Sequence, residues 1–115
     1  MNGTRTFAGL PRALLAGGTL VAALAAAAWG ADADVDQLGI RFSVAAIAVK
    51  AGDAVHFHNR DDVTHNLHVF DPGGDEEDKG LQKAGETVNE IFAKPGEYVV
   101  RCAIHPRMKM TVKVE

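Results

Sequence analysis

The chain has little of what would cross-link it covalently or give it a basic surface. It contains one cysteine in 115 residues, so an intramolecular disulfide is excluded. Its 12 basic residues stand against 15 acidic ones, a formal charge of −3, which argues against nucleic acid as a partner. From Asp32 onward there is also no amphipathic helical stretch of useful length. A small domain of this kind must be stabilised by its core, with a bound metal ion as one further source of stability.

Residues 1–30 are predicted to be a signal peptide. Arg5 and Arg12 belong to a short polar start, and residues 13–29 form an uncharged run of alanine, leucine, valine and glycine that ends in tryptophan. An uncleaved membrane anchor is the alternative, because this run approaches the roughly 20 residues that span a bilayer. In either case residues 31–115 are expected to be one domain outside the cytoplasm, in the periplasm, with membrane contact only if the segment is retained.

The residues after Asp32 predict an all-β fold. Short runs of β-branched and aromatic residues alternate with turn sequences such as "AGD", "DPGG" and "KPGE". Many short strands at this spacing are typical of an antiparallel sandwich or barrel. The acidic residues 71–80 are expected to form a solvated loop, with electrostatic steering of a positively charged partner as the alternative. The expected strands are residues 40–44, 47–50, 54–59, 66–70, 87–92, 97–102 and 110–114.

Side-chain alternation along these strands predicts which residues face the core. In residues 97–102, Cys102 shares a face with Tyr98 and Val100, because successive strand residues point to opposite sides. The thiol is therefore expected at the inner end of a strand, shielded from oxidants.

Cys102, His105 and Met108 form the motif C-x-x-H-x-x-M. Thiolate, imidazole and thioether ligands together favour copper over magnesium or calcium. Two histidines and one cysteine with a long axial methionine are the ligand pattern of blue-copper electron transfer. The second histidine must come from elsewhere in the chain. His65 is the best candidate, because it opens the predicted strand 66–70 and so lies at a strand end, as Cys102 does.

The other histidines have simpler interpretations. His68 has the opposite parity to His65 and is expected at the surface or in contact with a ligand residue. His56 and His58 are predicted to face solvent on one strand, where they could hold an adventitious metal ion. Their H-x-H pattern is only weakly similar to that of multicopper oxidases, which need several copies in a longer chain.

The chain resembles the cupredoxins, the type 1 blue copper proteins, most closely the amicyanin group and more distantly plastocyanin and pseudoazurin. The matching stretches are "VKAGDAVHFHNRDDVTHNLHV", "FAKPGEYVVRCAIHPRM" and "VKVE", in the family's order. The resemblance implies a Greek-key β-sandwich with His65, Cys102 and His105 as equatorial copper ligands and Met108 as the axial one. It also implies that Asn66 ties the two ligand-bearing loops together by hydrogen bonds near the cysteine sulfur.

The chain departs from this pattern at two places. Its N-terminal section is shorter than that of amicyanins, so the first strand is expected to be missing or irregular. Met110 stands where related sequences often have glycine, and the loop lengths of plastocyanin and pseudoazurin would select it as the axial ligand. Because Met110 shares its parity with Val112 and Val114, it is expected to pack in the core, and Met108 remains the predicted ligand.

The resemblance implies a monomeric electron carrier and no enzyme. It would transfer single electrons between redox proteins, such as a dehydrogenase donor and a c-type cytochrome acceptor. His105 is expected to be the exit for the electron, surrounded by Ala103, Ile104 and Pro106, and Arg107 beside it would select acidic partners. A copper carrier or buffer is the alternative function, and a zinc-binding sandwich ranks last.

Overall fold

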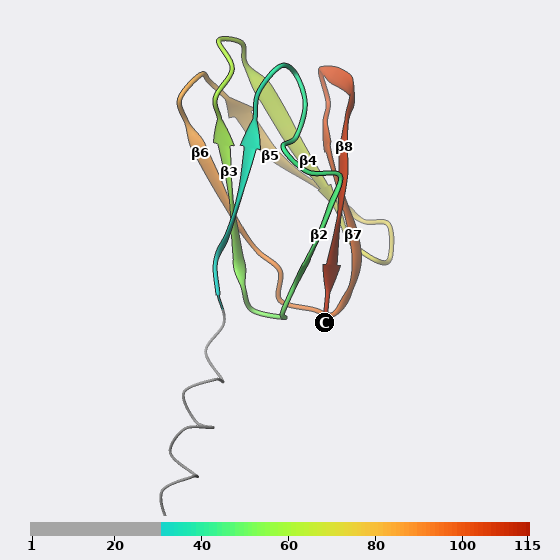
Figure 1. The fold of residues 1–115 in the computed structure, drawn as a ribbon. Coiled ribbons are helices and arrows are strands. Elements are labelled where there is room, and N and C mark those ends of the chain that lie inside the picture. The colour runs from blue at the N-terminus through green and yellow to red at the C-terminus, as the bar shows by residue number, and fades with distance from the viewer. Residues whose placement is uncertain (1–30) are drawn as a thin grey trace, which may run out of the picture.

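Residues 31–115, which the computed structural model describes, form two packed β-sheets (Figure 1). The predicted signal peptide lies outside the described residues. The described part of the chain contains no helix, and hence none long and apolar enough to cross a membrane. One sheet has the order β1-β3-β6 and the other β2-β8-β7-β4-β5. The strands are β1 (Ala33–Gln37), β2 (Ala46–Val49), β3 (Ala54–Asn59), β4 (His65–Phe70), β5 (Glu76–Gln82), β6 (Thr87–Ile91), β7 (Gly96–Cys102) and β8 (His105–Val114).

The connections between strands confirm the predicted sandwich. Only the connections β4–β5 and β7–β8 join neighbours in one sheet, and every other connection between described strands passes from one sheet to the other. As a result β4 lies beside β7, although β5 and β6 separate them in sequence, and Leu67 pairs with Cys102. This Greek-key order brings the beginning of β4 and the end of β7 to the same end of the molecule (Figure 1).

The core lies between the two sheets, on the faces that side-chain alternation predicts. Val55 and Phe57 of β3 are fully buried, whereas His56 and His58, which alternate with them, face outward. Cys102 is buried, as predicted. The buried core cluster contains Val35, Val49, Val55, Phe57, Leu67, Val69, Phe92, Tyr98, Val100, Met110, Val112 and Val114.

Buried amides join the two sheets close to the beginning of β4. Gln37 Nε2 donates a hydrogen bond of 2.8 Å to Gln82 Oε1, and Gln82 Nε2 donates one of 2.8 Å to the carbonyl oxygen of Phe57. Gln82 is also the strand partner of His65. These two hydrogen bonds hold the sheets together beside His65.

The N-terminal part of the domain differs from the sequence prediction. The expected strand at residues 40–44 is not formed, because Gly39 and Ile40 adopt left-handed φ angles of 69° and 56° and turn the chain. The first strand, expected to be missing or irregular, is instead the regular β1, which pairs in parallel with β3. The sequence did not predict β1 because aspartate is a poor strand former. Val35 and Gln37 alternate with the aspartates and face the core.

Two further boundaries differ. The acidic segment 71–80 is expected to be a solvated loop, but its second half belongs to β5, at the edge of the five-stranded sheet. Charged residues suit an edge strand because they oppose pairing with another chain. β8 begins at His105 rather than at Met110, since the residues after the β7–β8 turn already pair with β7.

Candidate metal centre

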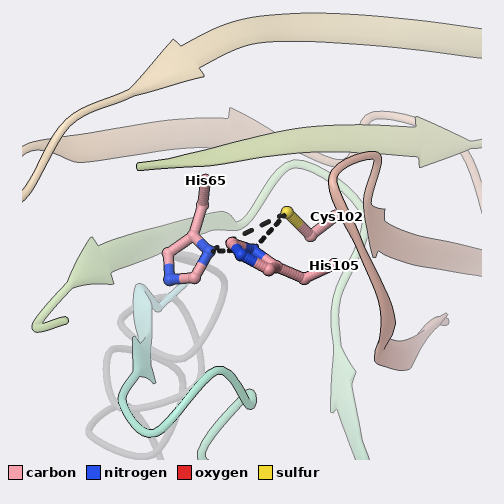
Figure 2. Close-up of side chains that lie close together, drawn as sticks. All are labelled: His65, Cys102 and His105. Carbon is pink, nitrogen blue, oxygen red and sulfur yellow. Dashed lines mark hydrogen bonds between the residues drawn. The ribbon is translucent and has the colours of Figure 1, made fainter. Parts of the chain in front are cut away.

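Three donor side chains converge where β4, β7 and β8 meet (Figure 2). His65 is the first residue of β4, Cys102 the last of β7 and His105 the first of β8. His65 Nδ1 lies 3.1 Å from His105 Nδ1 and 3.8 Å from Cys102 Sγ, and His105 Nδ1 lies 3.5 Å from the sulfur. These separations are short enough for one metal ion to contact all three atoms. Within residues 31–115 this is the one such group of three or more histidine, cysteine or acidic residues.

Cys102 is held in an environment that suits a thiolate. Its side chain is 2% exposed, and the backbone amide of Asn66 donates a hydrogen bond of 3.3 Å to Sγ. An amide donor stabilises the thiolate, the negatively charged form of cysteine that binds metals. The sequence prediction of a shielded thiol at the inner end of a strand agrees with this position.

The two histidines differ in their exposure. His65 is fully buried, and its Nε2 lies 2.8 Å from Asp61 Oδ2. His105 is half-buried, and its neighbours Ala103, Ile104 and Pro106 are exposed, with Ile104 at 50%. The site is therefore closed on the side of His65 and approaches the surface on the side of His105.

Asp61 is a residue that sequence reasoning missed. It belongs to the turn sequence "NRDD", where an aspartate is an ordinary turn former. The signal that could have found it is its place four residues before His65, combined with the tendency of metal-binding histidines to donate their other ring nitrogen to a carboxylate.

Met108 and Met110 both face inward from β8, so parity does not distinguish them as the sequence argument supposed. Their positions along the strand do. Met110 belongs to the hydrophobic core cluster and pairs with Val100, in the middle of the sheet. Met108 is only 1% exposed but lies outside that cluster, near the three converging side chains.

Asn66 links the ligand-bearing segments through its backbone. Besides the amide bond to Cys102 Sγ, its carbonyl oxygen accepts a hydrogen bond of 2.9 Å from the amide of Ala103. The side chain points elsewhere, and its Nδ2 donates to Asp78 and to the carbonyl oxygen of Gly80. The predicted tie between β4 and the β7–β8 turn is thus present, but it is made by main-chain atoms.

The remaining histidines lie on the outer faces of the sheets and do not belong to the group of converging donors. His68 contacts Glu76 and lies 3.3 Å from the side-chain oxygen of Asn66. His56 and His58 lie on the three-stranded sheet, where acidic residues of the N-terminal segment and polar residues of β6 face them. His56 and His58 each have their own hydrogen-bond partners, and they do not form a group of three potential metal ligands.

The donor set fits copper. A buried thiol with two imidazole nitrogens offers one soft and two intermediate ligands, and a buried thioether lies close by. Such a set suits copper far better than the hard cations magnesium and calcium. A β-sandwich with this site at one end defines a cupredoxin, the class of small copper proteins that the sequence resembles.

Comparison with known proteins supports the assignment of this chain to the cupredoxins. The chain belongs to the plastocyanin/azurin family of copper binding proteins, whose model matches residues 30–115. It is 32% identical to amicyanin-alpha of Methylorubrum extorquens over 90% of this chain and 87% of that protein. It is 35% identical to the methylamine utilization protein MauL of the same organism, over 59% of this chain and only 60% of MauL.

A solved structure supports the same assignment. The Cu(I) form of a methionine-to-alanine mutant of amicyanin is similar with a TM-score of 0.67 and 27% identity, over 73% of this chain and 82% of that one. The predicted family and the predicted cupredoxin fold are therefore confirmed, and the cofactor is copper in one type 1 site.

Proposed function

We propose that residues 31–115 are an exported electron carrier that transfers single electrons between redox proteins through this copper site. The observation that carries the proposal is the convergence of Cys102 Sγ with the Nδ1 atoms of His65 and His105 in a mostly buried site. We further propose Met108 as the axial ligand, because it is buried next to this group, whereas Met110 packs in the core.

The role of the protein chain is to hold its ligands in unchanging positions. Copper bound here supplies a one-electron couple, and a ligand set that needs little rearrangement keeps electron transfer fast. His65 and Cys102 lie at strand ends that Asn66 ties together, so neither can move independently of the sheet. Burial of His65, Cys102 and Met108 excludes water from that side of the site.

His105 is the proposed exit for the electron. It is the least buried of the three converging residues, and it lies among exposed apolar residues of the β7–β8 turn and early β8. An apolar surface around the exit allows a partner to dock closely without removing charges from water. The adjacent Arg107 is exposed and is proposed to favour partners with acidic docking surfaces.

The proposed setting follows from the relatives. Similarity to amicyanin-alpha supports a dehydrogenase as donor and a c-type cytochrome as acceptor, with a monomeric carrier in the periplasm after removal of residues 1–30. The carrier or buffer alternative relied on the additional histidines and on Met110. His56, His58 and His68 have other partners and Met110 lies in the core, so no observation favours that alternative.

Electron exchange of the copper-loaded protein tests the proposal. Reduced protein is mixed with an oxidised c-type cytochrome, and the rate is followed for the wild type, for Ile104→Glu and for Ile91→Glu. Both isoleucines are exposed, but Ile91 lies on β6 in the other sheet. Ile104→Glu is expected to slow the reaction at least about fivefold, the effect of losing about 1 kcal/mol of docking energy, without changing the reduction potential.

Ile91→Glu is expected to leave the rate unchanged. If the copper cannot be reduced and reoxidised reversibly by one electron, or if both variants slow the reaction equally, the proposed function or its docking surface is wrong.

A further inference from the structure

We propose that Asp61 is a positioning residue of the copper site, which fixes the ring of His65 and lowers the reduction potential through a buried negative charge. The inference rests on the proposed copper site and extends it to a residue outside the ligand set. Asp61 lies in the β3–β4 connection, four residues before His65, and its side chain is only 8% exposed.

The carboxylate of Asp61 has three hydrogen-bond donors around it. Oδ2 accepts from Nε2 of His65 at 2.8 Å and from the amide of Ile40 at 3.0 Å. Oδ1 accepts from the amide of Gly39 at 2.6 Å. The backbone is held as well, because the Asp61 amide donates to Asn59 Oδ1 at 2.9 Å. The carboxylate therefore has one defined orientation toward His65.

This contact determines which nitrogen of His65 is free to bind metal. A carboxylate accepts hydrogen bonds, so Nε2 of His65 carries the proton and Nδ1 keeps its lone pair. Nδ1 is the atom that lies 3.1 Å from His105 Nδ1 and 3.8 Å from Cys102 Sγ. Asp61 thus selects the tautomer in which His65 points its free lone pair at the other two donors.

The negative charge of Asp61 acts over a short distance with little water between. The hydrogen bonds from His65, Ile40 and Gly39 stabilise the ionised form of the Asp61 carboxyl in its nearly buried position. The group is an anion at neutral pH. An anion bonded to a ligand imidazole makes that imidazole a better donor and favours the more highly charged oxidised metal ion. The reduction potential falls in consequence.

Asp61 also couples the site to the segment that follows β1. Ile40 has a left-handed φ of 56°, a conformation that costs a branched residue about 1–2 kcal/mol. The two successive amides of Gly39 and Ile40 point at the same carboxylate, and these bonds offset that cost. The turn that replaced the expected strand at residues 40–44 is thus part of the support of His65.

Asp62 provides a matched control. It follows Asp61 directly but is exposed, so Asp62→Asn removes the same charge from nearly the same place without removing a bond to His65. The reduction potential of the copper-loaded protein is measured at constant pH and salt for the wild type, Asp61→Asn, Asp61→Ala and Asp62→Asn. We expect both Asp61 variants to raise the potential clearly and Asp62→Asn to leave it close to that of the wild type.

Two further measurements separate this role from a general effect on folding. We expect Asp61→Ala to weaken copper affinity about 10- to 100-fold, as loss of a carboxylate partner of a ligand histidine does at other metal sites. In the metal-free protein at pH 8, nitrogen-15 NMR is expected to show His65 protonated on Nε2 in the wild type and on a mixture of both nitrogens in Asp61→Ala.

The NMR result does not depend on electron transfer, so it decides the positioning role even if the proposed function fails. Circular dichroism confirms that each variant is folded, and Asp61→Asn, which keeps the shape of the side chain, serves if Asp61→Ala does not fold. The inference is overturned if Asp61→Asn and Asp62→Asn shift the potential equally, or if the tautomer of His65 is unchanged in Asp61→Ala.

Discussion

At the scale of single residues, the chemistry of the site depends on the one thiol of the chain. Cys102 is protected by burial and stabilised by the Asn66 amide, and it faces two imidazole nitrogens rather than a second thiol. Its position beside two imidazole nitrogens makes this free cysteine a metal ligand.

The two methionines of β8 are expected to respond differently to the same substitution. Met108→Leu should change the visible spectrum and reduction potential, because leucine has no sulfur to act as an axial ligand. Met110→Leu should leave both unchanged and cost less than about 1.5 kcal/mol of stability, because leucine fills a similar volume in the core. Spectra and potentials of the two copper-loaded variants check this. A spectrum altered only by Met110→Leu would show that Met110 is the axial ligand.

At the scale of elements, β1 is an edge strand held to β3 by a ladder of charged side chains. β1 has hydrogen-bonded strand pairing only with β3. On the outer surface of the sheet, every second side chain from Asp32 to Asp36 contacts every second side chain from His56 to Arg60. The pairs are Asp32–His56, Asp34–His58 and Asp36–Arg60, at 2.9, 2.8 and 3.2 Å.

This ladder predicts a pH-dependent contribution to stability. The hydrogen bonds that His56 donates to the side-chain oxygens of Asn89 and Asp32 raise its pKa above the usual 6.5. The contribution of His56 to stability is therefore complete below pH 6.5 and is lost as the pH rises through the raised pKa. The hydrogen bond of His58 lowers the pKa of Asp34 below 3.8, so that contribution is complete above pH 3.8 and is lost in more acidic solution.

The test is urea unfolding of the wild type and His56→Gln across a range of pH values. The stability difference between them is expected to be larger near pH 5.5 than at pH 9. Comparing the two proteins at each pH removes every contribution that they share. A difference that stays constant from pH 5.5 to pH 9 would mean that charge on His56 does not hold β1.

The start of β7 depends on a glycine. Gly96 has a φ of 137°, and a Cβ atom there would lie 2.4 Å from Cγ of Pro72, in the turn between β4 and β5. Gly96→Ala is therefore expected to destabilise the domain by about 1–3 kcal/mol through this overlap, beyond the cost of its backbone conformation. Gly74→Ala is the control, because Gly74 also has a positive φ but no atom within 4 Å of an added Cβ. Equal losses of stability in thermal unfolding would contradict the packing explanation.

Strand alternation predicted six of the eight strands and missed the two edge strands that are rich in acidic residues. The expected strand at residues 54–59 coincides with β3, because valine and phenylalanine alternate there with polar residues. β1 and β5 were missed because edge strands carry acidic side chains that read as loop, and their pairing depends on neighbours distant in sequence. Strand propensity alone does not predict which strands pair at the edge of a sheet.

At the scale of the whole molecule, the site exists because the sandwich brings distant segments to one end. The spacing of Cys102, His105 and Met108 could be read directly, since a short loop requires these residues to be close. His65 needed the additional inference that strand ends meet, which the pairing of β4 with β7 bears out. The contact with Asp61 could not be predicted, because it depends on the turn at Gly39 and Ile40, whose backbone no sequence pattern indicated.

The visible absorption spectrum of the copper-loaded wild type and of Cys102→Ser tests the central claim most directly. A thiolate bound to Cu(II) beside two imidazoles is expected to give the wild type an intense visible band that reduction bleaches and reoxidation restores. Serine offers no thiolate, so this band should be absent from Cys102→Ser. A serine variant that takes up copper with the same spectrum and the same redox behaviour would contradict the account.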